Sequence, residues 1–246
     1  MRLKDWEQKY SEILREFGYS REEDKESAII LNSILKDKFP LKKLREKIVN
    51  LTVFVIGSGP SLSSSIHVLK KYKNVTKIVA DGTTRTLMEN RIKPDIVVTD
   101  LDGDAKFLTK ASKANAIMVV HSHGDNQTRL YLTAEFKYCV GTTEGKPFGK
   151  ICNFGGFTDG DRCLFLARHF KAKKIILFGM DFGTKIGKHS RTRISDRKTK
   201  VRKLRKAKEL LEWIASKNNS GLYTTSGSIK GFQNIGFSKL EQIVAS

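Results

Sequence analysis

Short apolar runs alternate along the chain with longer stretches in which apolar residues recur at helical spacing. Each run is four or five residues long and leads into a loop of small or polar residues, a pattern typical of buried strands. Strands and helices in alternation predict an α/β fold with a doubly wound, mostly parallel sheet and helices on both faces. The runs that predict strands are 53–56, 77–80, 95–98, 116–120, 137–140 and 174–178, with 221–225 as a last edge strand.

A helical segment precedes the first strand. Trp6, Tyr10 and Ile13 recur at helical intervals, and a second helical pattern follows them. We expect residues 1–49 to form an N-terminal helical appendage that serves packing or oligomerisation. Residues 50–246 then form the α/β domain, which carries every candidate for catalysis.

Three carboxylates follow the predicted strand at 95–98 before any helix can begin. They are Asp100, Asp102 and Asp104, at alternate positions. Three anions this close repel one another unless a cation lies between them, and oxygen ligands of this kind favour Mg²⁺. The end of a strand is also where open α/β sheets bind ligands. Capping of the next helix explains Asp104 but not all three.

A glycine-rich turn after the first strand is a candidate phosphate site. Glycines let backbone N–H groups approach a phosphate closely, and the N-terminus of the next helix adds a partial positive charge. The turn has neither the Gly-Lys-Ser/Thr of a Walker A loop nor the third glycine of a dinucleotide fingerprint, so an ordinary strand-to-helix turn is the alternative. The candidate residues are Gly57, Ser58, Gly59 and Ser61.

Two other strand ends carry polar residues of similar kinds. Asp81 follows one strand, and Asp125 and Asn126 follow another. His121 and His123 could bind a metal, but no third nitrogen or sulfur ligand is evident, and the neighbouring acids favour Mg²⁺ over zinc. Hydrogen bonding to a phosphate or a heterocycle is the better role for these histidines.

Thr158, Asp159 and Asp161 lie at the start of a predicted apolar helix. Carboxylates are favoured in a first helical turn, so capping is one explanation for them. The preceding pair Gly155 and Gly156 favours close approach by a ligand as well. Both interpretations remain open from the sequence.

Composition narrows the class of protein. The 246 residues are 39% hydrophobic, enough for one substantial core, and carry a net charge of +20 that points to a polyanionic partner, either nucleic acid or a nucleotide polyphosphate. Three cysteines without C-x-x-C spacing indicate neither a disulfide framework nor a zinc ribbon. No apolar run approaches the ~18 residues that a membrane span needs. We therefore expect a cytoplasmic protein without a membrane partner.

Residues 185–208 hold twelve lysines and arginines against one acid, Asp196. Such a run binds nucleic acid nonspecifically in some proteins. After a strand end in an α/β sheet, it can equally fold over a triphosphate as a lid. Lys185 and Lys188 are the candidates for phosphate contact in this segment.

In this order, the motifs resemble those of the archaeal-type 6-hydroxymethyl-7,8-dihydropterin pyrophosphokinases, which are relatives of thiamine pyrophosphokinases. Thr99 and Gly103 differ from the Gly-Asp-x-Asp-Ser motif of the thiamine enzymes and favour the pterin enzymes. The matching blocks are 57–61, 80–83, 94–104, 121–126, 156–162 and 179–183, within about residues 50–235.

The resemblance implies an Mg²⁺-dependent transfer of diphosphate from ATP to the hydroxymethyl group of 6-hydroxymethyl-7,8-dihydropterin. AMP is released, and the product enters tetrahydromethanopterin or folate biosynthesis. Asp100 and Asp102 are the implied catalytic residues, and a homo-oligomer is possible. The implied Mg²⁺ ligands are Asp81, Asp100, Asp102 and Asp125, and the candidates for the pterin side are Asn126, Thr158, Asp159 and Asp161.

Two other classes of function remain. A nucleic-acid-binding protein that uses residues 185–208 accounts for the charge but leaves the aspartates at strand ends unexplained. A glycosyltransferase-like protein that handles nucleotide sugars is the other alternative, because similar glycine-rich and acidic motifs occur in that wider group.

Overall fold

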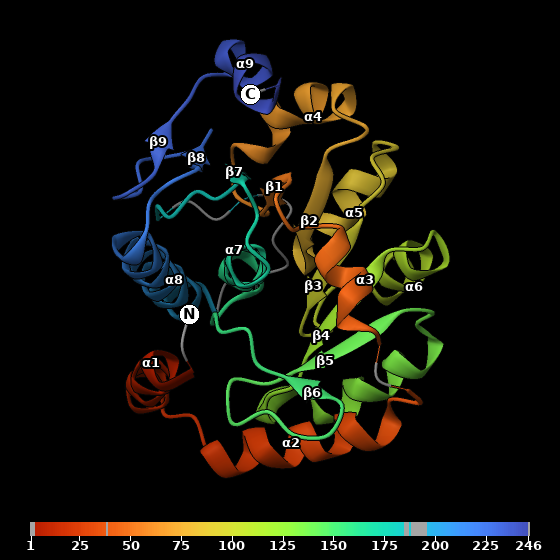
Figure 1. Ribbon diagram of the computed structural model, residues 1–246. Coiled ribbons are helices and arrows are strands. Elements are labelled where there is room, and N and C mark those ends of the chain that lie inside the picture. The colour runs from red at the N-terminus through yellow and green to blue at the C-terminus, as the bar shows by residue number, and fades with distance from the viewer. Residues whose placement is uncertain (1–2, 38, 185–186, 188–195, 246) are drawn as a thin grey trace.

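The computed structural model describes residues 3–37, 39–184, 187 and 196–245. Within these residues, nine parallel strands form one sheet in the order β6-β5-β4-β3-β2-β1-β7-β8-β9 (Figure 1). The strands are β1 (Thr52–Ile56), β2 (Thr76–Ala80), β3 (Ile96–Thr99), β4 (Ile117–His121), β5 (Cys139–Thr142), β6 (Ile151–Cys152), β7 (Lys174–Phe178), β8 (Leu222–Thr224) and β9 (Gln233–Asn234).

Helices cover both faces of this sheet, as the apolar strand runs require. The α-helices are α1 (Leu3–Phe17), α2 (Arg21–Ile34), α3 (Leu41–Glu46), α4 (Leu62–Lys71), α5 (Asp81–Glu89), α6 (Ala105–Lys113), α7 (Asp159–His169), α8 (Arg197–Lys217) and α9 (Leu240–Ala245). The 3₁₀ segments that lie wholly within the described residues include η1 (Gly124–Glu135) and η3 (Phe237–Lys239). The predicted doubly wound α/β class is confirmed.

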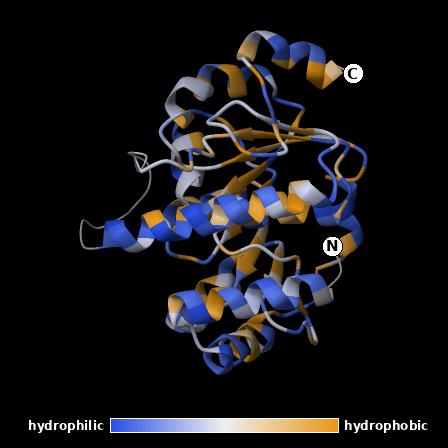
Figure 2. Ribbon diagram, turned by 90° about the vertical axis from the view of Figure 1, so that its left-hand side faces the viewer, coloured by the Kyte–Doolittle hydropathy of each residue, from blue (hydrophilic) through white to orange (hydrophobic). Residues whose placement is uncertain are grey.

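Alternate residues of β1 show how the two faces are packed. Val53 and Val55 join a core cluster with residues of α1, α7 and α8, whereas Phe54 and Ile56 join a cluster with residues of α4 and α9. Successive side chains of a strand point to opposite faces, so a strand buried on both faces has to be apolar throughout. Figure 2 shows the result, with orange strands behind α8 and α1, whose outward faces are mostly blue.

The strand order reverses at β1. The chain runs from β1 outward to β6, returns to the other side of β1 as β7, and continues to β8 and β9. Ligands bind doubly wound sheets in the crevice that such a reversal opens at the carboxyl ends of the strands. The turns after β1 and β7 are therefore where the topology places a site.

Two short strands are absent from the sequence prediction. β6 and β9 contain two residues each, which is too short for any apolar period to register. As a result, the prediction that 221–225 is the edge strand is wrong, because β8 pairs with β7 on one side and with β9 on the other.

The N-terminal helices share the core of the sheet. Trp6, Tyr10 and Ile13 are fully buried in the same cluster as Val53 and Val55. The indole of Trp6 donates a hydrogen bond of 2.9 Å to the backbone carbonyl of Glu144. The division of the chain at residue 50 stays a prediction about domain organisation. Among the described helices, none combines the length and the apolar character that crossing a bilayer demands.

Candidate active site

A cleft of about 470 Å³ opens at the carboxyl ends of the central strands. Its walls come from the turn after β1, the turn after β7, the loop after β3, the first residues of α7 and one side of α8. It therefore lies at the reversal of strand order, between Gly57 and Gly179. Polar and apolar groups line it together, as is usual for a site that takes a small molecule.

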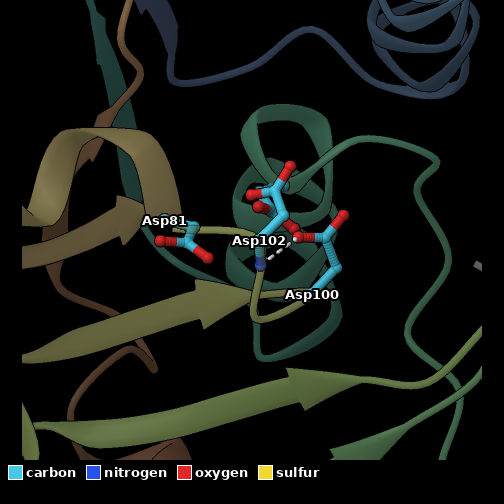
Figure 3. Close-up of side chains that lie close together, drawn as sticks. Asp81, Asp100 and Asp102 are labelled. Atoms are coloured by element: carbon cyan, nitrogen blue, oxygen red, sulfur yellow. Dashed lines mark hydrogen bonds between the residues drawn. The ribbon is translucent and has the colours of Figure 1, made fainter. Parts of the chain in front are cut away.

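Four aspartates meet in this cleft. Each offers one oxygen, and these oxygens lie within 4.8 Å of one another. Asp81 is the first residue of α5, Asp100 and Asp102 follow β3, and Asp159 is the first residue of α7. Figure 3 shows three of them side by side at neighbouring strand ends, with the backbone N–H of Asp102 donating to Asp100 at 3.2 Å.

Burial and mutual repulsion shift the protonation of this group. Burial raises the pKa of Asp81 to about 7, and the charges of Asp100 and Asp102 act in the same direction. Burial and the charge of Asp100 raise the pKa of Asp102 to about 6. The pKa of Asp159 is raised well above its usual range, first by burial and then by Asp100. These shifts indicate a concentration of negative charge that the protein does not neutralise by itself.

Asp100 behaves differently from the other three. Burial acts to raise its pKa, but a hydrogen bond and the charge of His123, together with Arg162, hold the pKa below its usual range. Nε2 of His123 lies 3.6 Å from a carboxylate oxygen of Asp100. Asp100 is therefore the member of the group that remains ionised most readily.

Two buried oxygens of the cluster are left without hydrogen-bond donors in the described part of the chain. They are Oδ1 of Asp81 and Oδ1 of Asp159, although the latter lies 3.6 Å from the Arg162 guanidinium. The other oxygen of Asp81 accepts hydrogen bonds from Thr99 at 2.5 Å and from the backbone of Gly103 at 3.1 Å. Buried acceptors without donors, among four carboxylates, fit a hard divalent cation.

Gly103 leaves the space beside Asp81 open. A Cβ atom on Gly103 would lie 1.6 Å from Oδ1 of Asp81, which is far inside van der Waals contact. Only glycine lets this backbone approach the carboxylate so closely. The unpartnered oxygen and the missing side chain together form a cradle for a small cation.

Comparison with known proteins identifies the family. The family model described as "6-hydroxymethylpterin diphosphokinase MptE-like" matches residues 28–187, which is more than half of the chain. The chain belongs to this family. The resemblance drawn from its motifs is confirmed.

Three archaeal relatives of the MptE-like family carry the name 6-hydroxymethyl-7,8-dihydropterin pyrophosphokinase. The protein from Pyrococcus furiosus is 45% identical over 227 residues, which cover 89% of this chain and 96% of the relative. The protein from Methanocaldococcus jannaschii is 43% identical, and the match covers 88% of this chain and 97% of the relative. The protein from Methanothermobacter thermautotrophicus is 38% identical, and the match covers 87% of this chain and 95% of the relative.

A solved structure shares the fold. The MAf glycosyltransferase of Magnetospirillum magneticum AMB-1 superposes with a TM-score of 0.62 at 14% identity, over 91% of this chain and 41% of that chain. At this identity the likeness concerns the fold alone.

The glycine-rich turn of this MptE-like chain is packed against the turn after β7. The N–H of Gly59 donates to the carbonyl of Gly179 at 2.8 Å, and a Cβ on Gly57 would lie 2.8 Å from the same oxygen. Ser61 donates through its backbone and its hydroxyl to Asp181, at 2.9 and 2.7 Å. Gly57, Ser58 and Gly59 line the cleft.

Asp181 therefore takes up donors that the sequence assigns to a phosphate. The phosphate role of Gly57, Ser58, Gly59 and Ser61 stays a prediction. Lys185 and Lys188 lie outside the described residues. Among the described residues, Lys200 and Lys203 of α8 line the cleft.

Asp125 lines the cleft but stands apart from the four aspartates that meet. Its side chain is 72% exposed and lies 4.0 Å from Nδ1 of His123. The fourth member of the cluster is Asp159, which the sequence assigns to the pterin side. The metal role of Asp125 stays a prediction, and the geometry favours Asp159 in its place.

Asn126 and Asp161 support the backbone around the site. The Asn126 amide donates to the carbonyls of Asp100 and His121 at 2.8 Å each and accepts from the N–H of His123. Asp161 accepts from the N–H groups of Phe157 and Thr158, both at 2.7 Å. Contact of Asn126, Asp161 and the cleft-lining Thr158 with a pterin stays a prediction.

The sequence prediction missed a buried ion pair behind the cluster. Arg162 donates to Glu144 at 2.5 Å, and both side chains are less than a tenth exposed. Burial raises the pKa of Glu144 to about 7, against the opposing charge of Arg162. Glu144 follows β5, so its position after a strand, like that of the aspartates, could have identified it from the sequence. Arg162 lies inside a motif of the resemblance but had no role there.

Proposed function

We propose that this protein transfers diphosphate from ATP to the hydroxymethyl oxygen of 6-hydroxymethyl-7,8-dihydropterin with Mg²⁺ as cofactor, and releases AMP. The observation that carries the proposal is the meeting of four aspartates at the reversal of strand order in an MptE-like chain. The product would enter tetrahydromethanopterin or folate biosynthesis, as the resemblance of the motifs implies. A cytoplasmic location is part of the same proposal.

The residues that would hold the metal are Asp81, Asp100, Asp102 and Asp159. Three of them follow the neighbouring strands β2 and β3, and the fourth is the first residue of α7, so the fold fixes their separation before any ligand binds. When bound, Mg²⁺ supplies neutralisation of the phosphate charge and a fixed position for the nucleotide, as in other phosphoryl-transfer enzymes. The aspartates contribute charge and geometry, and none needs to form a covalent bond.

Lysines of α8 and the turn after β1 would bind the phosphates. Lys200 and Lys203 face the cleft from one side, and Ser58 faces it from the other. Phosphoryl transfer depends mainly on holding donor and acceptor in line and on stabilising the charge of the transition state. A cleft with carboxylates on one wall and lysines on another provides both functions.

The reaction itself is the first test. Incubation with ATP, Mg²⁺ and 6-hydroxymethyl-7,8-dihydropterin is expected to yield AMP and pterin diphosphate in equal amounts, because the attacked atom is the β-phosphorus. Chromatography of the nucleotides and pterins measures both products. Formation of ADP would show transfer of a single phosphoryl group and contradict the proposal, and omission of the pterin is the control for ATP hydrolysis.

Stabilisation by Mg²⁺ is expected to depend on pH. The pKa of Asp81 is about 7 and that of Asp102 about 6, so both bind protons as the pH falls from 8 to 5.5. Protons then compete with the metal. At a tenfold excess over its dissociation constant at pH 8, Mg²⁺ is expected to raise the Tm by about 3–6 °C. The same concentration at pH 5.5 is expected to have little effect.

Scanning calorimetry without nucleotide measures this difference, with KCl at equal ionic strength as the control for screening. The sign follows from the raised carboxyl pKa values: the folded protein without metal holds protons on these groups below pH 6, and releases them when the metal binds. An equal rise in Tm at both pH values would contradict the assignment of Asp81 and Asp102 as metal ligands.

A further inference from the structure

The cleft continues into a smaller hollow under the corner between α1 and α2. This hollow measures about 40 Å³, room for a few water molecules and less than a two-ring heterocycle needs. A ring that reaches into it must therefore lie at its junction with the larger cleft. The residues that line both spaces are Tyr19, Asp100, Asp125, Phe157 and Lys203.

Aromatic rings form one wall of this junction. Phe17 stacks on Tyr19, with ring centroids 5.8 Å apart and planes inclined by 19°. Phe157 lies 6.4 Å from Tyr19 and 4.9 Å from Phe17, so it fixes the group against α7. Tyr19 is only partly buried and presents its ring to the cleft. Planar heterocycles stack on such surfaces.

A buried acid and a buried guanidinium line the hollow and are not among the residues that line the larger cleft. Glu144 and Arg162 line it and pair at 2.5 Å. Nε of Arg162 is buried and has no hydrogen-bond partner among the described residues. The 2-amino-4-oxo edge of a pterin carries two N–H donors beside a carbonyl acceptor. A carboxylate beside a guanidinium with a free donor complements that edge.

We propose that the pterin ring binds at this junction, stacked on Tyr19, with its polar edge toward Glu144 and Arg162. The hydroxymethyl group then points past Asp100 toward the aspartate cluster, where the diphosphate is transferred. This inference rests on the proposed function and adds the place of the second substrate. It also makes the corner between α1 and α2, which the sequence predicts only to pack or oligomerise, a part of the substrate site.

Lys203 connects the ring site with the phosphate side of the cleft. Its ammonium lies 5.4 Å from the ring centroid of Tyr19 and 5.8 Å from that of Phe157. Lysine has a flexible stem, so the ammonium can move from the aromatic rings to phosphate oxygens in the same cleft. The two substrates would then lie on either side of one side chain of α8.

Replacement of Tyr19 tests this placement. Tyr19→Ala is expected to raise the KM for 6-hydroxymethyl-7,8-dihydropterin between about fivefold and about a hundredfold, the range that loss of one aromatic stacking partner produces. The KM for ATP is expected to stay within about twofold. Tyr19→Phe keeps the ring, so its KM for the pterin is expected to rise less than that of Tyr19→Ala. Tyr131→Ala is the matched control, because Tyr131 is 66% exposed on η1.

Calorimetric titration separates this inference from the proposed function. The pterin is titrated into each protein with Mg²⁺ and α,β-methylene-ATP, whose bridging carbon prevents cleavage between the α- and β-phosphorus atoms. Loss of affinity in Tyr19→Ala alone supports the placement. Equal affinity of Tyr19→Ala and an active wild type overturns it and leaves the proposed function intact. Absence of pterin binding and of AMP formation in the wild type overturns both.

The polar edge is tested with a changed ligand. 6-Hydroxymethyl-7,8-dihydrolumazine carries an oxygen where the pterin carries its 2-amino group, so it would present an acceptor to Glu144. We expect its affinity to be lower by at least about tenfold, because a buried carboxylate is then left facing an acceptor. Equal affinity for the two heterocycles would overturn the orientation toward Glu144 and Arg162.

Discussion

The variant Asp102→Asn is expected to lose at least about a hundredfold in kcat, since it removes one charge from the four aspartates that would hold a metal against the phosphates. Asp102 follows β3 and lines the open cleft. Asparagine has nearly the same shape as aspartate, so the fold should be unaffected. The Mg²⁺ concentration for half-maximal activity should rise as well. Steady-state kinetics over a range of Mg²⁺ concentrations measure both quantities.

Asp104→Asn is the matched control for this experiment. Asp104 lies two residues further along the same loop and caps α6 by accepting a hydrogen bond from the N–H of Lys106. Asparagine caps helices as well as aspartate does, so this variant should keep its activity within a few-fold. If Asp102→Asn is well folded and turns over at a rate similar to Asp104→Asn, the four aspartates are not a catalytic metal site.

Gly103→Ala is expected to abolish Mg²⁺ binding and to lower kcat by at least about a hundredfold. The added methyl group would lie 1.6 Å from Oδ1 of Asp81, so either the loop after β3 or the Asp81 carboxylate has to move. Both carry candidate ligands, and displacements of about 1 Å cost large factors in rate. The change leaves every charge in place, so it tests geometry apart from electrostatics.

Gly227→Ala is the control, because a Cβ atom there has no neighbour within 4 Å. Kinetics and the rise in Tm with Mg²⁺ are measured on both variants. We expect the wild-type response in Gly227→Ala and none in Gly103→Ala. A Gly103→Ala protein that binds Mg²⁺ with unchanged affinity would show that the space beside Asp81 is not part of the metal site.

The aspartates at strand ends could be predicted because a parallel sheet imposes their meeting. Asp81 and Asp100 follow β2 and β3, which pair with each other, so their side chains had to end at the same edge. The strands themselves were visible as apolar runs, since a strand buried on both faces cannot contain alternating polar residues. Because the strands pair in parallel, residues that follow different strands in the sequence end at the same edge of the sheet.

The sequence pattern could not show which of Asp125 and Asp159 lies with Asp81, Asp100 and Asp102 in the aspartate cluster. Both follow a strand and lie in the first turn of a helical segment. What separates them is the packing of α7 against β1, β2 and β3, which turns Asp159 inward, whereas Asp125 stays in solvent. Such an outcome depends on contacts between elements far apart in the chain, and no local pattern records it.

Asn126 and Asp161 illustrate a second limit. A polar residue beside a ligand site and a polar residue that holds a loop look identical in sequence. In the structure, the Asn126 amide bridges the loop after β3 to the end of β4, and Asp161 closes the first turn of α7. Backbone N–H and C=O groups at these buried loop ends need partners, and these side chains provide them.

The central position of β1 has a consequence for synthesis on the ribosome. β1 can pair with β2 soon after both emerge, but its other edge pairs with β7, where Thr52 meets Lys174. Until the nascent chain reaches Phe178, one edge of this mostly apolar strand therefore stays open to pairing with other chains. Parallel sheets with distant partners also form slowly. Heterologous expression at reduced rate, or with added chaperones, should therefore increase the soluble yield of this protein.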